Sequence, residues 1–295
     1  MLRALVVSFA ILIATLEAHA ADKNPAAPES GANIDSKQPT PNASSTAGAI
    51  SGEDPAAENE LLEAANKSRA GAGAMALRMD DSLRDAARTH ARRMIENDRL
   101  AHQFSGELGL LERIGEASSL KIDRVGENVA YASAAFDVNE ALMHSAPHRE
   151  NLLDRGFNVA GMAAIWSDGK LYVVQDFAHN VPSYSARESR ALVGHAVAEM
   201  RRRAGLPELV QLMPAKLDEA TCSLAKESRP KAHEIAVAYN NRRVITYTQS
   251  HPEIIPLEAT RLLDDTDVRQ FAVGACYARN AAYPAGTYWV AILLY

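Results

Sequence analysis

The sequence predicts an α+β protein in which helices come first and an antiparallel hairpin comes last, in two related copies. Apolar residues recur at helical spacing over residues 80–95, which indicates an amphipathic helix. The spacing then changes, and two apolar runs at 157–166 and 170–178 are joined by a Ser-Asp-Gly tripeptide, which is typical of a hairpin turn. At an offset of 134, seven of the 23 residues from 69 to 91 recur identically. We therefore expect the same layering of helices on a sheet twice.

Helix-capping and helix-breaking residues predict where the helices of the first copy begin and end. Asp followed by Pro indicates the start of a helix, since the Asp side chain can accept hydrogen bonds from the free N–H groups and Pro suits the first helical position. Glycine indicates its end. Residues 98–128 are expected to be mostly loop with one short helix. The expected helices run from 55 to 70, 81 to 95, 108 to 114, 138 to 145 and 149 to 153, with Asp54, Asp80 or Asp81, and Asp137 as caps.

The second copy is expected to be shorter than the first. The offset pairs Arg69 with Arg203, and the Phe-Asn-Val at 157–159 resembles the Phe-Ala-Val at 271–273. From Ala91 to Phe157 is 66 residues, whereas the corresponding interval in the second copy is 46 residues. The missing stretch holds most of the histidines of the first copy, so the second copy is expected to be degenerate.

The N-terminus has the pattern of an export signal. Arg3 precedes an apolar run over residues 4–16, and Ala-His-Ala at 18–20 fits a cleavage site. That run is shorter than the roughly 20 residues of a spanning helix, so we expect no stable membrane span after cleavage. The expected organisation is a signal peptide at 1–20, a disordered Pro/Ala/Ser-rich linker at 21–55, a first domain at 56–182 and the degenerate copy at 186–295.

Composition limits the classes of partner. The chain has 37 acidic and 31 basic residues, and a net charge of −6 argues against nonspecific nucleic-acid binding. Its two cysteines, Cys222 and Cys276, can form at most one disulfide, which would require an oxidising compartment. Two unpaired buried thiols are the alternative.

Three segments of the first copy combine histidine and glutamate in a recognisable order: Ala101-His102, then Arg124-Val-Gly-Glu127-Asn-Val-Ala130, then Ser145-Ala-Pro-His148-Arg-Glu-Asn-Leu-Leu153. With the Phe-Asn-Val-Ala-Gly that follows, they resemble the bacterial SCP-like branch of the CAP superfamily (cysteine-rich secretory, antigen 5, pathogenesis-related 1). The resemblance covers residues 58–180 well. It implies an α–β–α sandwich, and a cleft lined by two His and two Glu that can hold a divalent cation, Zn or Mg.

Carried over by motif, the resemblance assigns His102 and His148 as the two histidines and Glu127 as the first glutamate. Ser145 stands where the second glutamate is expected, and Glu140 lies more than one turn away. The expected binding cleft is therefore His102, Glu127, Ser145 and His148, with His102 and His148 as candidate metal ligands.

Two imidazoles can bind zinc and leave positions open for water, and Glu127 could then hold a proton. Alternatively, the Glu127–Asn128 turn simply fixes the loop through backbone amides.

We favour a noncatalytic, exported module that binds a small apolar or envelope-derived ligand, or a protein partner. Relatives in the family bind sterols and other lipids, which supports a hydrophobic ligand. One alternative is a metal-assisted hydrolase that uses His102 and His148 as ligands and Glu127 as base. A second is a structural protein of the cell envelope. The expected location is the periplasm or the extracellular space, because the resemblance is to bacterial members and the chain has neither a lipobox cysteine nor a wall-sorting tail.

The remaining candidates carry weaker predictions. His144 and His148 have i, i+4 spacing, but Pro147 between them disfavours one continuous helix. The same proline makes a productive pair of Ser145 with His148 unfavourable, and no orienting acid is evident, so we do not expect a serine hydrolase. We expect His90 to be a hydrogen-bonded core residue and His179 to be a surface residue. The Arg-Arg-Arg run at 201–203 is expected to form a solvated helix face.

Overall fold

The computed structural model describes residues 32–33, 52–226, 232–241 and 243–295. The predicted signal peptide and most of the predicted linker lie outside the described residues. Within the linker, residues 32–33 and 52–53 form short strands. The chain divides into two compact units, with the break between Asn180 and Val181. We call the part before this break the first unit and the part after it the second unit.

The first unit contains eleven described helices and strands, in an order that mixes the two types. They are β1 (Ala32–Asn33), β2 (Gly52–Glu53), α1 (Pro55–Gly71), β3 (Arg78–Met79), α2 (Asp81–Glu96), α3 (Leu110–Ala117), β4 (Ile122–Ala132), α4 (Ala135–His144), α5 (Ala146–Leu153), β5 (Val159–Ser167) and β6 (Lys170–Asn180).

Antiparallel pairing of the three long strands makes the centre of the first sheet. The strand order is β1-β4-β6-β5-β2, and β3 also pairs with β5. The predicted hairpin is β5–β6, and its turn residues Asp168 and Gly169 have φ of 48° and 75°. Both values lie in the left-handed region that a tight hairpin turn requires.

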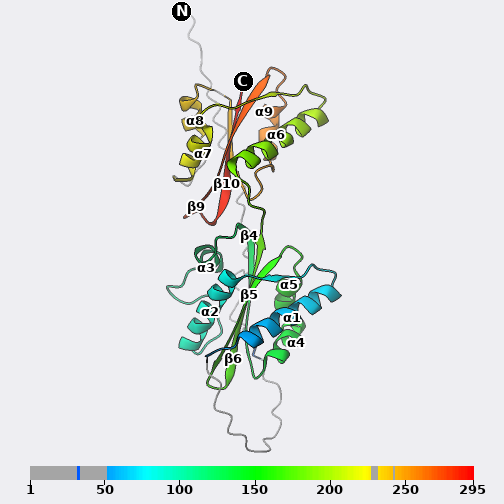
Figure 1. The fold of residues 1–295 in the computed structure, drawn as a ribbon, viewed down its shortest axis with the longest axis vertical. Coiled ribbons are helices and arrows are strands. Elements are labelled where there is room, and N and C mark those ends of the chain that lie inside the picture. Colours follow the sequence, from blue (N-terminus) through cyan, green and yellow to red (C-terminus); the bar gives the residue numbers. More distant parts are fainter. Residues whose placement is uncertain (1–31, 34–51, 227–231, 242) are drawn as a thin grey trace, which may run out of the picture. The chain divides into compact units, whose positions relative to one another are not determined.

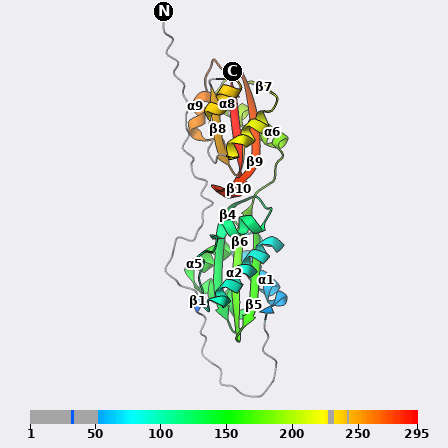
Figure 2. The ribbon, with the colours of Figure 1, turned by 90° about the vertical axis from the view of Figure 1, so that its left-hand side faces the viewer.

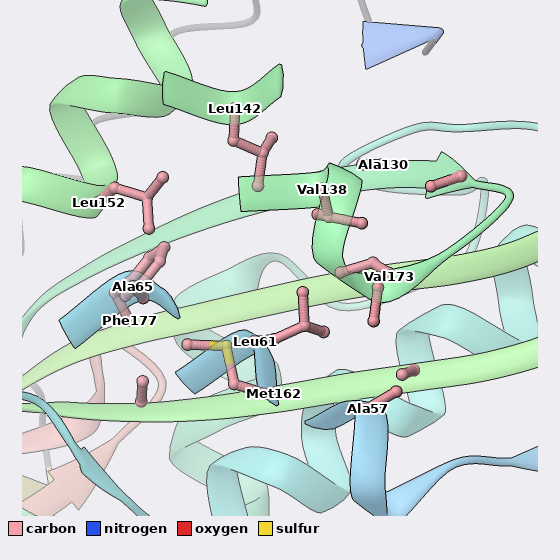
Figure 3. Close-up of a cluster of buried hydrophobic side chains, with 14 of the residues drawn as sticks. Ala57, Leu61, Ala65, Ala130, Val138, Leu142, Leu152, Met162, Val173 and Phe177 are labelled. Atoms are coloured by element: carbon pink, nitrogen blue, oxygen red, sulfur yellow. The ribbon is translucent and has the colours of Figure 1, made fainter. Parts of the chain in front are cut away.

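Helices cover both faces of this sheet, so the first unit is a three-layer α–β–α sandwich and the predicted α+β class is confirmed. Figure 1 shows α2 and α3 on one side of the strands and α1, α4 and α5 on the other. On the second face, Leu61 of α1, Val138 of α4 and Leu152 of α5 gather over the strands in one apolar cluster (Figure 3). On the opposite face, Ala87 and Met94 of α2 pack in a separate cluster with strand residues.

Two helix starts follow the predicted capping residues. The Asp54 side chain accepts from the Ala57 N–H, and the Asp80 side chain accepts from the N–H groups of Ser82 and Leu83. The start of α4 was predicted wrongly: its N-cap is Ala134, and Asp137 lies in the first turn. An acidic residue is favourable at either place because both lie at the positive end of the helix dipole.

The largest difference from the predicted elements is at β4. Most of this eleven-residue strand lies in the region that was predicted to be a loop. Residues 125–130 are all buried, so polar Glu127 and Asn128 interrupt the apolar run without facing water. A strand that buries polar groups on both faces lacks the apolar–polar alternation from which strands are recognised. As expected, Pro147 prevents one continuous helix: α4 ends at His144 and α5 begins at Ala146.

The second unit has a smaller sheet, with strand order β7-β9-β10-β8. Its elements are α6 (Ala186–Arg203), β7 (Val210–Leu212), α7 (Leu217–Lys226), α8 (Ala232–Ala238), β8 (Val244–Gln249), α9 (Leu257–Leu263), β9 (Gln270–Asn280) and β10 (Tyr283–Leu294). Figure 1 shows α7 and α8 on one side of this sheet and α6 and α9 on the other, and Figure 2 shows its strands side by side.

Each face of the second sheet has its own apolar cluster. Val193 and Val197 of α6 pack with Leu263 of α9, whereas Leu217 and Leu224 of α7 pack on the opposite face. A disulfide joins Cys222 of α7 to Cys276 of β9.

The arginine run at the end of α6 is only partly a solvated face. Arg202 and Arg203 are exposed and pair with Glu199, but Arg201 is buried, so the prediction was wrong for that residue.

Candidate functional site

Glu127 is the centre of a buried group of charged side chains on the α2–α3 side of the first sheet. It lies on β4, directly across from Asp176 of β6, and is 1% exposed. Its Oε1 accepts from Nδ1 of His102 at 2.8 Å, and its Oε2 accepts from the guanidinium of Arg113. Both carboxylate oxygens are therefore already bound within the protein.

His90 lies next to this carboxylate and has an acceptor at each ring nitrogen. Nδ1 is 2.7 Å from Oε1 of Glu107, and Nε2 is 2.8 Å from the carbonyl oxygen of Ala101 and 3.8 Å from Oε2 of Glu127. Both nitrogens must donate to satisfy these contacts, so the geometry favours the imidazolium. Burial works to lower the pKa of His90, but Glu127 and Glu107 raise it above its ordinary value.

Charge compensation keeps Glu127 ionised despite complete burial. Burial alone would raise the pKa of this carboxyl, but His90, the hydrogen bond from His102 and the charge of Arg113 lower it to about 2. Arg113 also donates to the carbonyl oxygen of His102 at 3.1 Å, which holds the loop carrying His102 against β4. His102 is the exposed edge of the group, since 35% of its side chain is accessible.

Asp176 is a second buried carboxyl, and it behaves differently from Glu127. No described residue donates a hydrogen bond to either of its oxygens, and the side chain has no exposed surface. Burial and the negative charge of Glu127 across the strand pair raise the pKa of Asp176 well above its ordinary value. Both effects favour the neutral form of Asp176 beside the Glu127 carboxylate.

His148 is held by α5 and is buried, and its ring contacts Ser145 rather than Glu127. The Nδ1 atom lies 2.8 Å from Oγ of Ser145, so Pro147 does not prevent contact between these two side chains. The break between α4 and α5 makes Ser145 the N-cap of α5, and it brings the serine hydroxyl to the side chain three residues later. Burial, and then the charge of nearby His102, lower the pKa of His148, which favours the neutral imidazole.

Amide side chains fix α5 against β4. Asn151 donates to the carbonyl oxygen of Glu127 at 2.9 Å, and Asn128 donates to the carbonyl oxygen of His148 at 3.1 Å. These buried bonds account for the Glu-Asn and His-x-x-Asn spacings in the sequence, because each motif supplies one amide that satisfies the backbone of the other.

Of the four predicted site residues, the structure joins His102 to Glu127 and Ser145 to His148, and the charge of His102 contributes to the lowered pKa of His148. Glu140 is exposed and has no contact with this group.

The remaining histidines are described by their contacts. His144 is exposed and bonded to its own helix, and His179 is half-buried on Asp123. His90 is a hydrogen-bonded core residue, but its partners belong to the Glu127 group, which the sequence did not indicate.

The side chains do not fit a bound metal ion. Among the described residues, no three His, Cys, Asp or Glu side chains are placed to hold one. The Glu127 carboxylate is covered by the Arg113 guanidinium, and the Nδ1 atoms of His102 and His148 are occupied by hydrogen bonds. A cation at Glu127 would have to replace Arg113, and two remaining imidazole nitrogens are fewer than the three protein ligands of ordinary zinc sites.

The part of the chain that contains this site matches a known protein family. Residues 62–177 match the model of the cysteine-rich secretory protein family, CAP. No curated protein matches the chain.

Several solved structures resemble parts of the chain. An outer surface protein from Borrelia burgdorferi is 19% identical, with a TM-score of 0.41, over 45% of this chain and 100% of that one. An extracellular protein containing an SCP domain from Bacillus anthracis str. Ames is 23% identical, with a TM-score of 0.38, over 42% of this chain and 41% of that one. Na-ASP-1 is 7% identical, with a TM-score of 0.45, over 84% of this chain and 90% of that one.

None of the described helices combines the length and the apolar character needed to cross a membrane.

Proposed function

We propose that the protein, whose residues 62–177 match the CAP model of the cysteine-rich secretory protein family, is an exported, noncatalytic binding module. Its ligand is a small apolar or envelope-derived molecule or a protein partner, bound at the His102 edge of the Glu127 group. One observation carries the proposal: both oxygens of Glu127 are occupied by His102 and Arg113. A carboxylate held in this way orients a histidine and is not available as a base.

The alternatives that require chemistry have less support. A metal-assisted hydrolase needs a third ligand, which the described residues do not place near His102 and His148. Ser145 and His148 form a hydrogen-bonded pair, but no described carboxylate contacts the His148 ring to orient it. The neutral His148 and the exposed edge of His102 suit hydrogen bonding to an uncharged or anionic head of a ligand.

We also propose that the second unit is a degenerate copy of the first. Its support begins with Arg69 of α1 and Arg201 of α6, both buried. Each donates to a carbonyl six residues later, and each donates to two carbonyls at the end of the helix that precedes the hairpin. The acceptors are Met75, Leu152 and Asp154 for the first arginine and Pro207, Leu263 and Asp265 for the second, and the first arginine donates in addition to the carbonyl oxygen of Phe157. These contacts pair Arg69 with Arg201, and not with the exposed Arg203 that the sequence offset indicated.

The copies also agree at the contact between a helix and the hairpin. A side chain at Gly161 would collide with the backbone at Leu83 of α2, and one at Gly274 would collide with Leu217 of α7. Leu83 and Leu217 are the pair that the offset of 134 aligns. The second unit therefore has two more residues than the first between β7 and α7. For this reason no single offset aligns both α6 with α1 and α7 with α2.

This alignment supports a loss of the charged group in the second unit. Asp176 pairs with Gly161 and Glu127 pairs with Asp176 in the first sheet. In the second sheet, Gly274 pairs with Ala291, and Ala291 pairs with Thr246, so Ala291 takes the position of Asp176 and Thr246 that of Glu127. The offset of 134 places Leu224 at the position of His90. Leu224 and Ala291 belong to an apolar cluster, so the second unit keeps the scaffold without the site.

Export is proposed on two grounds. The sequence begins with an export-signal pattern, and Cys222 and Cys276 form a disulfide, a bond that persists in oxidising compartments. The periplasm and the extracellular space both satisfy these grounds.

A paired-variant experiment tests the binding function. The His102→Ala/His148→Ala double variant is compared with His144→Ala, an exposed histidine outside the group, and with wild type. The readouts are bound metal by elemental analysis, hydrolysis of a p-nitrophenyl ester, and titration with a dansylated fatty acid as the apolar probe. We expect no stoichiometric metal, no hydrolysis, and probe binding that weakens at least about tenfold, or 1.4 kcal/mol, in the double variant only.

Stoichiometric metal in wild type, together with an ester hydrolysis that the double variant loses, would establish the enzyme instead. Equal probe binding in all three proteins would remove the His102 edge as the binding surface.

A further inference from the structure

A side-chain amide closes the contact between α1 and the sheet edge in the first unit. The Asn66 carboxamide donates to the carbonyl oxygen of Leu77 at 3.0 Å and accepts from the N–H of Leu77 at 2.7 Å. Leu77 directly precedes β3, which lies at the sheet edge beside β5. One amide thus satisfies both backbone groups of a residue that has no further strand beside it.

The second unit repeats this edge without the amide. Val210 of β7 pairs with Gln270 of β9 in parallel, as Arg78 of β3 pairs with Val159 of β5. The buried arginines of α1 and α6 differ by 132 residues, and Arg78 and Val210 differ by the same number. Leu209 therefore takes the place of Leu77, and Ala198 takes the place of Asn66. The position of Leu62, which packs on the first apolar cluster, is taken by Gly194.

These smaller side chains leave a pocket of about 250 Å³ between α6 and β7. Its lining includes Gly194, His195, Ala198, Leu209, Gln211 and Phe271. Within the described part of the chain, neither the N–H nor the carbonyl of Leu209 has a hydrogen-bond partner. The pocket is therefore lined by both apolar and polar side chains, with the Gln211 side-chain amide against Gly194, and Leu209 contributes one unpaired donor and one unpaired acceptor to its wall.

We propose that this pocket binds a primary carboxamide, which supplies the two hydrogen bonds that Asn66 makes in the first unit. The inference rests on the proposed relationship between the two units. A primary carboxamide presents its carbonyl and one N–H on the same edge, so it can bond to both groups of Leu209 at once. An ordinary trans peptide bond places its carbonyl and N–H on opposite edges and cannot do so.

The size of the pocket limits the occupant further. Drug-sized ligands occupy pockets of about 300–1,000 Å³, so a pocket of about 250 Å³ suits a small molecule or a side chain and not a larger ligand. The apolar surface of Phe271 and Leu209 favours a carboxamide carried on a short apolar stem or ring. An asparagine or glutamine side chain of a partner, or a small aromatic amide, satisfies both conditions.

The test is a titration of the full chain, followed by amide NMR, with benzamide and N-methylbenzamide as matched probes. Both carry the same ring, but N-methylbenzamide is a trans secondary amide that cannot present both groups on one edge. We expect benzamide to shift the amide signal of Leu209 in a saturable way and to bind at least about tenfold more tightly than its methylated analogue. Equal affinities, or saturable shifts only outside the pocket, would overturn the proposal.

Variants of α6 give a second measurement. Ala198→Asn restores the amide of the first unit, so it should abolish the benzamide shifts and raise the melting temperature. Ala198→Leu fills the same space without an amide and should abolish the shifts with no stabilisation from hydrogen bonds. Ala196→Asn, on the same helix outside the lining, should leave benzamide binding unchanged.

Benzamide binding that persists in Ala198→Asn contradicts the proposal. The wild-type titration decides it even if that variant does not fold. Because the probes address only the second unit, a negative result leaves the function proposed for the His102 edge unaffected.

Discussion

Replacing Glu127 with glutamine should reduce the acid sensitivity of the first unit. The pKa of this carboxyl falls from 4.5 to about 2 on folding. Each unit of pKa corresponds to about 1.36 kcal/mol, so ionised Glu127 stabilises the fold by about 3 kcal/mol. Because the folded pKa is the lower one, this stability is fully present above pH 4.5 and is lost as the pH falls toward 2. Glutamine cannot ionise, so Glu127→Gln should be less stable at about pH 7 and nearly as stable as wild type at about pH 2.

The assay is urea unfolding between about pH 7 and about pH 2, followed by tryptophan fluorescence. The chain has two tryptophans, so a Trp289→Phe background leaves Trp166 as the reporter of the first unit. The quantity to compare is the difference in unfolding free energy between Glu127→Gln and wild type at each pH, because other carboxyls then cancel. Glu150→Gln, at an exposed carboxyl on α5, is the matched control for replacing a carboxylate with an amide. A difference that stays constant across this range would refute the assignment of Glu127 as a buried, ionised carboxylate.

Three further changes test the packing around the site and the second unit. Asp176→Asn should raise the midpoint of unfolding at about pH 7. The pKa of Asp176 is higher in the folded protein than in the unfolded chain, so the carboxyl costs stability as the pH rises, whereas an amide does not ionise. An unchanged or lower midpoint would contradict the raised pKa of Asp176. Gly161→Ala should cost about 3 kcal/mol in urea unfolding, since its methyl group would collide with the helix backbone at Leu83, whereas Gly71→Ala, with open space around it, should cost far less. Reducing the bond between Cys222 and Cys276 should destabilise the second unit by about 2–4 kcal/mol, measured by calorimetry with and without reductant, and equal melting curves would contradict this.

The parts of the fold that the sequence predicted are those governed by local rules. The start of α1 at Pro55 and the β5–β6 turn at Asp168 and Gly169 depend on neighbouring residues only, so short patterns identify them. β4 could not be recognised in this way, because Glu127 and Asn128 are stabilised by contacts with residues far along the chain. Their polarity is typical of a loop until those partners are known.

The same limit explains which site residues were missed. His102, Glu127 and His148 lie in motifs that resemble a known family, so they could be named before the structure. Arg113 and Asp176 complete the group. The neighbours of Arg113 do not distinguish it from a surface charge, and although Asp176 lies in the apolar run of a predicted strand, that run does not show which residue lies opposite it. Only the pairing of β4 with β6 places Asp176 opposite Glu127, and that register follows from the whole sheet.

On the proposed relationship between the two units, the residues that maintain the scaffold can be separated from those that form the site. Arg201 and Gly274 keep the contacts of Arg69 and Gly161, and each contact involves backbone that any sequence on this scaffold must satisfy. The charged residues are not retained, because each depends on the others. An unpaired carboxylate in the place of Thr246 would be buried without compensation, so the loss of one partner favours the loss of all. If the second unit is a copy, as we propose, the Glu127 group is present in the first unit as a complete set, and this pattern agrees with the proposed role of the group in binding.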